Sequence, residues 1–121
     1  MGDGWETRRR RVPGNDFIII ELGTPGLISN VEIDTCHFKG NFPDRVSIQT
    51  IDLKNEKDKI KAFEASSNWE FFLDEKKCKP DFIHNFGKND FLHENTVSHV
   101  RLNIYPDGGV SRFRIFGQPV S

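Results

Sequence analysis

Two stretches near the C-terminus alternate apolar and polar residues, a pattern typical of β-strands with one buried face. The first runs over 99–105 and the second over 110–116. Between them, residues 106–109 (Pro-Asp-Gly-Gly) have the composition of a hairpin loop. We therefore predict a β-hairpin with Tyr105 opposite Val110, because a slip of one residue would mix its apolar and polar faces.

This predicted hairpin contains a charge conflict. Its register sets Arg101 directly across from Arg114, with Arg112 two residues from Arg114. Like charges directly opposite each other destabilise a sheet, so we expect a compensating anion. Acidic side chains of a neighbouring strand, such as Glu32 or Asp34, are one source. A carboxylate ligand is the other, because a guanidinium group binds a carboxylate through two hydrogen bonds.

The rest of the chain predicts short strands separated by loops. The predicted strands are Phe17–Leu22, Leu27–Thr35, Val46–Thr50, Trp69–Leu73 and Phe82–Phe86. Turn residues at 24–26 and a loop over 36–44 separate the first three. The charged stretch Leu53–Lys61 predicts either a solvated linker or a short exposed helix.

Composition supports the all-β interpretation. The chain has 11 phenylalanines, and aromatic residues favour pleated surfaces, whereas helix formers are scarce. Its 121 residues suit one domain. Lysine and arginine number 17 against 18 acidic residues, a net charge of −1, which argues against a nucleic-acid-binding protein.

No segment predicts a membrane span or a signal peptide. The apolar run Phe17–Ile20 is far shorter than the ~20 residues of a spanning helix and too short for a signal sequence. Two cysteines are too few for a disulfide framework. We expect a cytoplasmic protein. The last residues, 118–121, are no peroxisomal signal, and a peroxisomal location is left open.

Three polar, glycine-containing segments are more specific than these patterns. They are GDGWETRRR at 2–10, DTCHFKGNFP at 34–43 and HVRLNIYPDGGVSR at 99–112. In order and spacing they resemble the allantoicase repeat, over nearly the whole chain and most weakly between Asp52 and Asn95. The resemblance identifies residues 1–121 as a single, N-terminally truncated repeat, because family repeats have a few tens of residues before the first segment.

The resemblance implies an all-β fold, a jelly-roll β-sandwich similar to galactose-binding-like domains, either complete or lacking its first strand. Family members usually carry two such repeats in one chain. A missing strand would leave an unpaired sheet edge, which invites pairing with another chain. We therefore expect self-association or pairing with a second repeat.

The family's activity is the hydrolysis of allantoate to ureidoglycolate and urea, a step of allantoin degradation in purine catabolism. The resemblance thus implies an allantoicase, a hydrolase with a small-molecule substrate. The alternative is an inactive single repeat or a ligand-binding β-sandwich module derived from the family. A sugar-binding module rests on fold analogy alone.

Urea release needs a cationic anchor for the substrate carboxylate, a proton donor for the leaving nitrogen and help for the attacking water. At the matched positions the candidate catalytic residues are Glu6, Asp34, His37 and His99. The candidate substrate-binding residues are Lys39, Asn41, Arg101, Arg112 and Arg114. A divalent metal ion would also serve this chemistry, but the spacing matches no recognised zinc motif, so the cofactor stays open.

Each candidate has a structural alternative. Glu6 follows Trp5, which would raise its pKa, but it also has the neighbouring arginines 8–10 as ion-pair partners. A histidine such as His37 serves as a base or a metal ligand, yet one in a loop is often structural. His84 and His93 lie in the weakly matched region, and we predict that both are surface residues.

Overall fold

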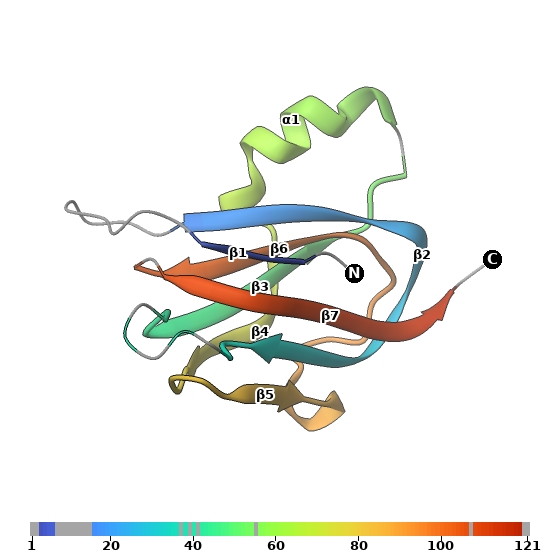
Figure 1. Ribbon diagram of the computed structural model, residues 1–121. Helices are drawn as coiled ribbons and strands as arrows, with labels where there is room; N and C mark the ends of the chain where they lie inside the picture. Colours follow the sequence, from blue (N-terminus) through green and yellow to red (C-terminus); the bar gives the residue numbers. More distant parts are fainter. Residues whose placement is uncertain are drawn as a thin grey trace.

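The strands form a sandwich of two layers that one long strand, β2 (Asp16–Asp34), joins (Figure 1). The computed structural model describes residues 3–6, 16–36, 38, 40, 42–54, 56–106 and 108–119. The other strands are β1 (Asp3–Glu6), β3 (Arg45–Ile51), β4 (Glu70–Lys77), β5 (Ile83–Phe86), β6 (Val97–Tyr105) and β7 (Gly109–Pro119). The helical pieces are the short helix α1 (Lys59–Glu64) and 3₁₀ turns at Glu56–Asp58, Ser66–Asn68 and Lys88–Asp90.

Strand β2 changes layers half-way along its length. Its first half pairs with β6, from Asp16 opposite Ile104 to Glu21 opposite His99. Its second half pairs with β7 on one side and β5 on the other. The register is irregular between Glu21 and Gly26, where the sequence predicted a turn. The chain therefore bends there without leaving the sheet, and the two predicted strands on either side are one continuous strand.

This bend sorts the strands into two groups. The first half of β2 lies beside β6, followed by β3 and β4. The second half lies between β7 and β5, and β1 lies beyond β7. All these pairs are antiparallel. The prediction of an all-β sandwich is confirmed, and the predicted short strands coincide with β2, β3, β4 and β5.

The core lies between the two layers and uses the residues that alternate along the strands. Val100, Leu102 and Ile104 of β6 are fully buried and pack with Ile33 of β2 and Phe113 of β7. Burying an aliphatic or aromatic side chain of this size contributes about 1.5–3 kcal/mol. The alternation in the sequence therefore identified the apolar face that meets the core, but the polar face of β6, with His99, Arg101 and Asn103, is buried as well.

The predicted hairpin between 99–105 and 110–116 is wrong. Strand β6 pairs with β2 and β3, whereas β7 pairs with β1 and β2, so the connection after Tyr105 crosses from one layer to the other. Arg101 consequently lies opposite Ile19 and Gln49 rather than opposite Arg114. Alternation reports which face of a strand is buried, but it carries no information about which strand lies beside it.

The charged stretch Leu53–Lys61 contains the first turn of α1, in agreement with the predicted short helix. This helix has six residues, and none of them is buried. In Figure 1 it lies beside the first half of β2. No helix among the described residues is long and apolar enough to cross a membrane.

Truncating the core at β6 should cost much of the stability of the domain. We expect Leu102→Ala to lower the free energy of unfolding by about 2–5 kcal/mol, because it leaves a cavity between the layers. Leu92, which is 57% exposed, is the matched control. Its change to alanine should cost about 0.5 kcal/mol or less. Urea unfolding followed by tryptophan fluorescence measures both, and equal costs would contradict this account of the core.

Candidate functional site

The three sequence segments that carry the family resemblance meet at one end of the sandwich. Strand β7 joins them, because Arg112 lies opposite Asp3 of β1 on one side and opposite Asp34 of β2 on the other. Glu6, at the end of β1, lies opposite Gly109. Segments that are far apart in the chain therefore converge around the start of β7.

The loop after β2 packs onto the two glycines that precede β7. A side chain at Gly109 would overlap the Phe38 ring, with its Cβ only 2.2 Å from a ring carbon. Gly108 has a φ of +131°, and a Cβ there would lie 2.6 Å from the backbone of Phe42 and Pro43. The Gly-Gly pair thus permits close approach of this loop, rather than closing a hairpin as predicted.

Asp34 is held as an ionised carboxylate at this end. Its Oδ1 accepts a 2.7 Å hydrogen bond from the backbone N–H of Cys36. Burial by itself raises the pKa of Asp34, but hydrogen bonds with Cys36 and Ser111 and the positive charge of Arg112 outweigh it, so the pKa lies below its ordinary value. The Ser111 hydroxyl also donates to the Asp34 backbone carbonyl at 2.9 Å, which ties β7 to the end of β2.

The Cys36 thiol is a poor nucleophile at neutral pH in this setting. Its hydrogen bond to Asp34 and the charge of that carboxylate raise the pKa of Cys36 to about 11, so the thiol stays protonated at neutral pH. The cysteine therefore acts as a hydrogen-bond donor to the carboxylate. Cys78, at the start of the loop after β4, is buried, and burial raises its pKa to about 12.

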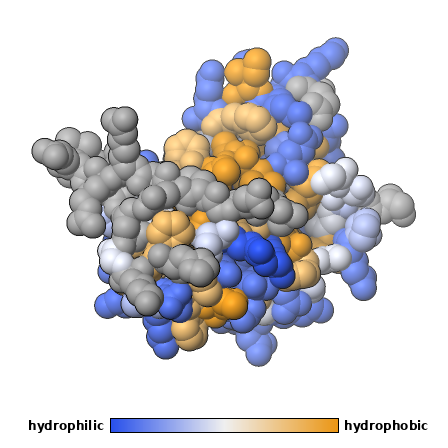
Figure 2. All heavy atoms as spheres, viewed as in Figure 1, coloured by the Kyte–Doolittle hydropathy of each residue, from blue (hydrophilic) through white to orange (hydrophobic). Residues whose placement is uncertain are grey.

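A second pair of opposite charges lies beside the first on the outer face of β2 and β7. Glu32 lies opposite Arg114, two residues along each strand from the Asp34–Arg112 pair. Figure 2 shows a strongly hydrophilic area over β7 on this face. Of the two sources of negative charge that the sequence left open, the acidic residues of a neighbouring strand are therefore present opposite both arginines of β7.

His37, Lys39 and Asn41 lie outside the described residues, and for Glu6 the structure describes the backbone alone. Of the predicted site residues, Asp34, Arg112 and Arg114 share one face of the β2–β7 pair. The backbone of Glu6 lies at the same end of the sandwich.

His99 lies in a different environment. It is six residues before the end of β6 at Tyr105, about 20 Å along the strand. Its side chain is buried, its Nδ1 is 2.8 Å from the Ser98 hydroxyl, and its ring meets the Phe63 ring of α1 edge-on at 5.4 Å. The structure does not bring His99 together with Asp34.

Arg101 is also buried, on the face of β6 that the Ser66–Asn68 turn covers. Its guanidinium group lies over the Phe17 ring, 3.7 Å from the ring centre. Its Nε donates to Asn103 at 2.8 Å, and Nη1 donates to the Ser66 hydroxyl. The predicted basic patch of His99, Arg101, Arg112 and Arg114 is wrong, because β6 and β7 belong to different layers.

The same polar network continues from Asn103 into β3. The Asn103 amide donates to Gln49 at 2.9 Å and to Ser47 at 3.2 Å, and Gln49 donates to the backbone carbonyls of Ser67 and Trp69. Buried polar groups of this kind are stable only when they are paired. The network therefore fastens the segment after α1 onto the sheet.

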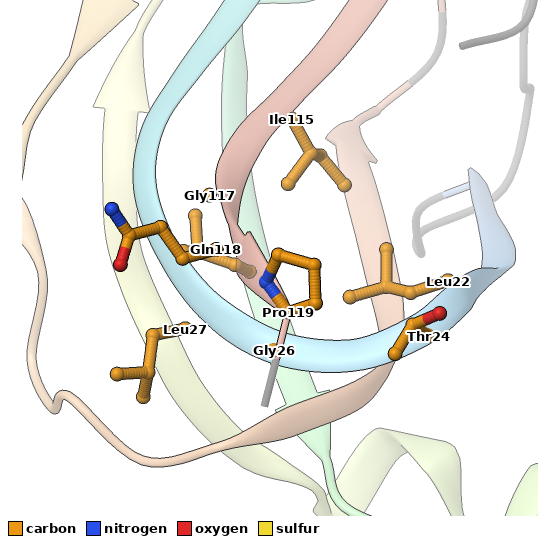
Figure 3. A pocket seen from close by; sticks show the side chains of 9 residues that line it. Leu22, Thr24, Gly26, Leu27, Ile115, Gly117, Gln118 and Pro119 are labelled. Carbon is orange, nitrogen blue, oxygen red and sulfur yellow. The ribbon is translucent and has the colours of Figure 1, made fainter. Parts of the chain in front are cut away.

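Two hollows lie at the other end of the sandwich, where β2 bends. The first, of about 280 Å³, is walled mainly by apolar side chains, among them Leu22, Ile115 and Pro119 (Figure 3). The second, of about 320 Å³, is lined by polar groups of Thr50, Glu70, His93 and others. Neither contains a residue of the three family segments.

The surface positions predicted for His84 and His93 are wrong. The His84 ring is buried and bridges the Ile33 carbonyl at 3.0 Å and the Lys79 N–H at 2.8 Å. The His93 side chain is 9% exposed, and its Nε2 is 2.9 Å from the Thr50 hydroxyl. The His84 ring pairs with backbone groups and the His93 ring with a side-chain hydroxyl. No periodic pattern in the sequence signals such a role.

Among the described residues, no three His, Cys, Asp or Glu side chains gather closely enough to hold a metal ion.

Comparison with known proteins identifies the family. The family model of the allantoicase repeat matches residues 1–120. The chain belongs to the allantoicase family. A probable allantoicase from Rhizobium meliloti (strain 1021) is 49% identical over 120 residues, which cover 98% of this chain and 35% of that protein. Probable allantoicase 2 from Burkholderia pseudomallei (strain K96243) is 50% identical over 118 residues, covering 98% and 34%.

The fold comparison gives the same family. The crystal structure of allantoicase from Saccharomyces cerevisiae superposes with a TM-score of 0.76 at 33% identity, covering 95% of this chain and 31% of that one. The chain therefore spans about a third of the length of the allantoicases that it matches.

The glycine at position 108 should be essential for this end of the fold. We expect Gly108→Ala to lower the free energy of unfolding by about 1–3 kcal/mol, because φ is positive and the added Cβ meets backbone atoms. Gly23→Ala is the matched control, since no atom lies within 4 Å of a Cβ there. Thermal unfolding compares the two variants, and an equal loss would contradict the proposed packing.

The link between Asp34 and Cys36 predicts slow thiol chemistry. With a pKa of about 11, Cys36 should react with iodoacetamide about tenfold faster for each pH unit between 8 and 10. Asp34→Asn removes the charge that raises this pKa, so alkylation at pH 8 should become about ten- to a hundredfold faster.

Glu32→Gln is the control for this measurement, because it removes a charge from the same face. Mass spectrometry of the folded protein follows Cys36, while buried Cys78 should stay unmodified. An unchanged rate in Asp34→Asn would refute the link.

Proposed function

We propose that this chain is the substrate-binding repeat of an allantoicase-type hydrolase that converts allantoate and water to ureidoglycolate and urea. Membership of the allantoicase family supports the reaction. The observation that carries the site is the pairing of Asp34 with Arg112, opposite each other where the three family segments meet.

This pair matches the two kinds of polar group on allantoate. The substrate has one carboxylate and two ureido groups on a single carbon. Arg112 is exposed and offers a fork of N–H donors to the carboxylate. Asp34 is ionised, and its carboxylate accepts an N–H group of a ureido group in addition to its hydrogen bonds with Cys36 and Ser111.

The spacing of these two residues suits a substrate of this size. Residues directly opposite each other in an antiparallel pair have Cα atoms about 4.5–5.5 Å apart. A cation and an anion at that spacing bind groups on neighbouring atoms of one small molecule. Arg114, two residues further along the same face, is a second cation for the carboxylate.

We assign the proton transfers to residues of the first and second family segments. Urea release needs a donor for the leaving nitrogen and a base for water. We assign these roles to Glu6, which ends β1 opposite Gly109, and to His37, three residues after Asp34. Lys39 and Asn41 belong to the same loop sequence and complete the polar contacts. Buried His99 and Arg101 receive no substrate contact in this proposal.

A binding module without turnover is the second candidate. It is favoured by the length of the chain, which spans about a third of the allantoicases that it matches. A site that needs groups from the rest of such a protein would still bind allantoate here through Arg112 and Asp34, but would not release urea.

Urea release from allantoate by the purified chain, with and without added divalent metal, tests the proposal. Arg112→Ala should raise KM about tenfold or more, since it removes the anchor of the carboxylate. Asp34→Asn, and the double variant Glu6→Gln with His37→Ala, should lower kcat/KM by about a hundredfold or more. Lys61→Ala, an exposed cation of α1, is the control and should change neither.

Calorimetric titration with allantoate separates the two candidates. Turnover that depends on these residues supports the hydrolase. Binding that Arg112→Ala weakens, without urea release, supports the module. Turnover or binding that is insensitive to both Arg112→Ala and Asp34→Asn would refute the site.

A further inference from the structure

The turn between β4 and β5 contains an aspartate in an unusual backbone conformation. Pro80 and Asp81 are its central residues, and Asp81 has a φ of +49°. Among the residues that the structure describes, no other non-glycine residue has a positive φ. Glycine adopts this conformation without steric cost, whereas aspartate does so under strain. The turn itself gives no reason for a carboxylate here, and residues held under strain cluster at functional sites.

This turn is anchored to the end of β2. The hydroxyl of Thr35, which is fully buried, donates to the Lys79 carbonyl at 2.7 Å and accepts from the Phe82 N–H at 3.1 Å. The Thr35 N–H donates to the Phe82 carbonyl at 2.8 Å. Because Thr35 stands between Asp34 and Cys36 in the chain, these bonds fix the turn beside the candidate site.

His84 ties the turn to β2 a second time. Its Nδ1 is 3.0 Å from the Ile33 carbonyl, and its Nε2 accepts from the Lys79 N–H at 2.8 Å. A neutral imidazole with its proton on Nδ1 satisfies both partners. The position of the turn is therefore set by two side chains, Thr35 and His84, that are themselves buried.

Asp81 also contacts the loop after β2. Its N–H donates to the carbonyl of Phe38, a residue of the second family segment, at 3.2 Å. The Asp81 side chain is exposed, and its charge acts on the Cys36 thiol. The hydrogen bond to Asp34, burial, and the charges of Asp34 and Asp81 together raise the pKa of Cys36 to about 11. Two carboxylates therefore lie around Cys36, from segments that are far apart in the sequence.

We propose that Asp81 is a further substrate-binding residue, which accepts N–H groups from the second ureido group of allantoate. The inference rests on the proposed function, in which Arg112 binds the carboxylate of the substrate and Asp34 binds the first ureido group. A ureido group has N–H donors on both of its nitrogens. A carboxylate has about four acceptor positions, so Asp81 binds such a group in addition to its contacts within the protein.

This assignment makes Asp81 a specificity-determining residue. Hydantoate has one carboxylate and a single ureido group, so it engages Arg112 and Asp34 but provides no group for Asp81. Allantoate engages all three side chains. The contribution of Asp81 should therefore appear with allantoate and not with hydantoate.

Calorimetric titration with allantoate and with hydantoate tests the assignment. Asp81→Asn should weaken allantoate binding about tenfold, because it removes the charge from an acceptor of ligand hydrogen bonds. The same variant should leave hydantoate binding unchanged. Arg112→Ala should weaken the binding of both ligands, since both have the carboxylate that it anchors.

Asp81→Gly separates binding from folding. Glycine adopts a positive φ without steric cost, so the unfolding temperature should not fall below that of the wild-type chain. Allantoate binding should nevertheless weaken as it does in Asp81→Asn. Glu94→Gln removes an exposed carboxylate from the loop before β6, and as the matched control it should change the affinity for neither ligand.

Alkylation of Cys36 measures the placement of Asp81 without any ligand. Asp81→Asn should speed the reaction with iodoacetamide at pH 8 about two- to fivefold, because it removes one of the charges that raise the pKa of the thiol. Glu94→Gln should leave the rate unchanged. A rate in Asp81→Asn equal to that of the wild-type chain would overturn the placement of Asp81 at the site.

The binding outcomes distinguish this inference from the function on which it rests. Equal weakening of both ligands by Asp81→Asn would overturn the role of Asp81 alone. So would unchanged allantoate binding in Asp81→Asn, when Arg112→Ala weakens it. Failure of the wild-type chain to bind either ligand would overturn the proposed function and this inference with it.

Discussion

The continuity of β2 through the bend at 22–26 is the constraint on which the other parts of the structure depend. Nineteen residues of one strand serve two layers, with β6 as the neighbour of the first half and β7 as the neighbour of the second. At Gly26 a Cβ would lie 2.5 Å from the Gln118 carbonyl, so the bend and the end of β7 pack backbone against backbone. Once this strand is in place, β6 and β7 must lie in different layers.

That separation decides which charged residues meet. The arginines of β7 lie opposite the acidic residues of β2 on the outer face of one layer. Arg101 of β6 lies on the other layer, buried in a network of neutral polar side chains. The same residue type therefore has two roles in one fold. At Arg112 it is an exposed, charge-paired group near the family segments, whereas at Arg101 it holds the segment after α1 against the sheet.

The two ends of the sandwich differ in chemistry for the same reason. At the Asp34 end, antiparallel pairing gathers three segments that are distant in sequence, and Gly108 and Gly109 let the loop after β2 approach the start of β7. At the opposite end, the bend of β2 opens an apolar hollow beside Ile115 and Pro119. The Asp34 end offers charged hydrogen-bonding groups in fixed register. For this reason it suits the substrate that we propose, a polar ureide with a carboxylate.

The sequence by itself determined the fold class, the core-facing side of each main strand and the family. Those properties follow from local alternation and from motifs of mixed polar residues and glycine, which are visible in one segment at a time. Only the tertiary structure decided that the segments around Leu102 and Phe113 lie in opposite layers, that His99 is buried under α1 and that Asp34 faces Arg112. Strand neighbours depend on contacts across the whole chain, and a pattern with a period of two residues is equally compatible with any partner whose apolar face points inward.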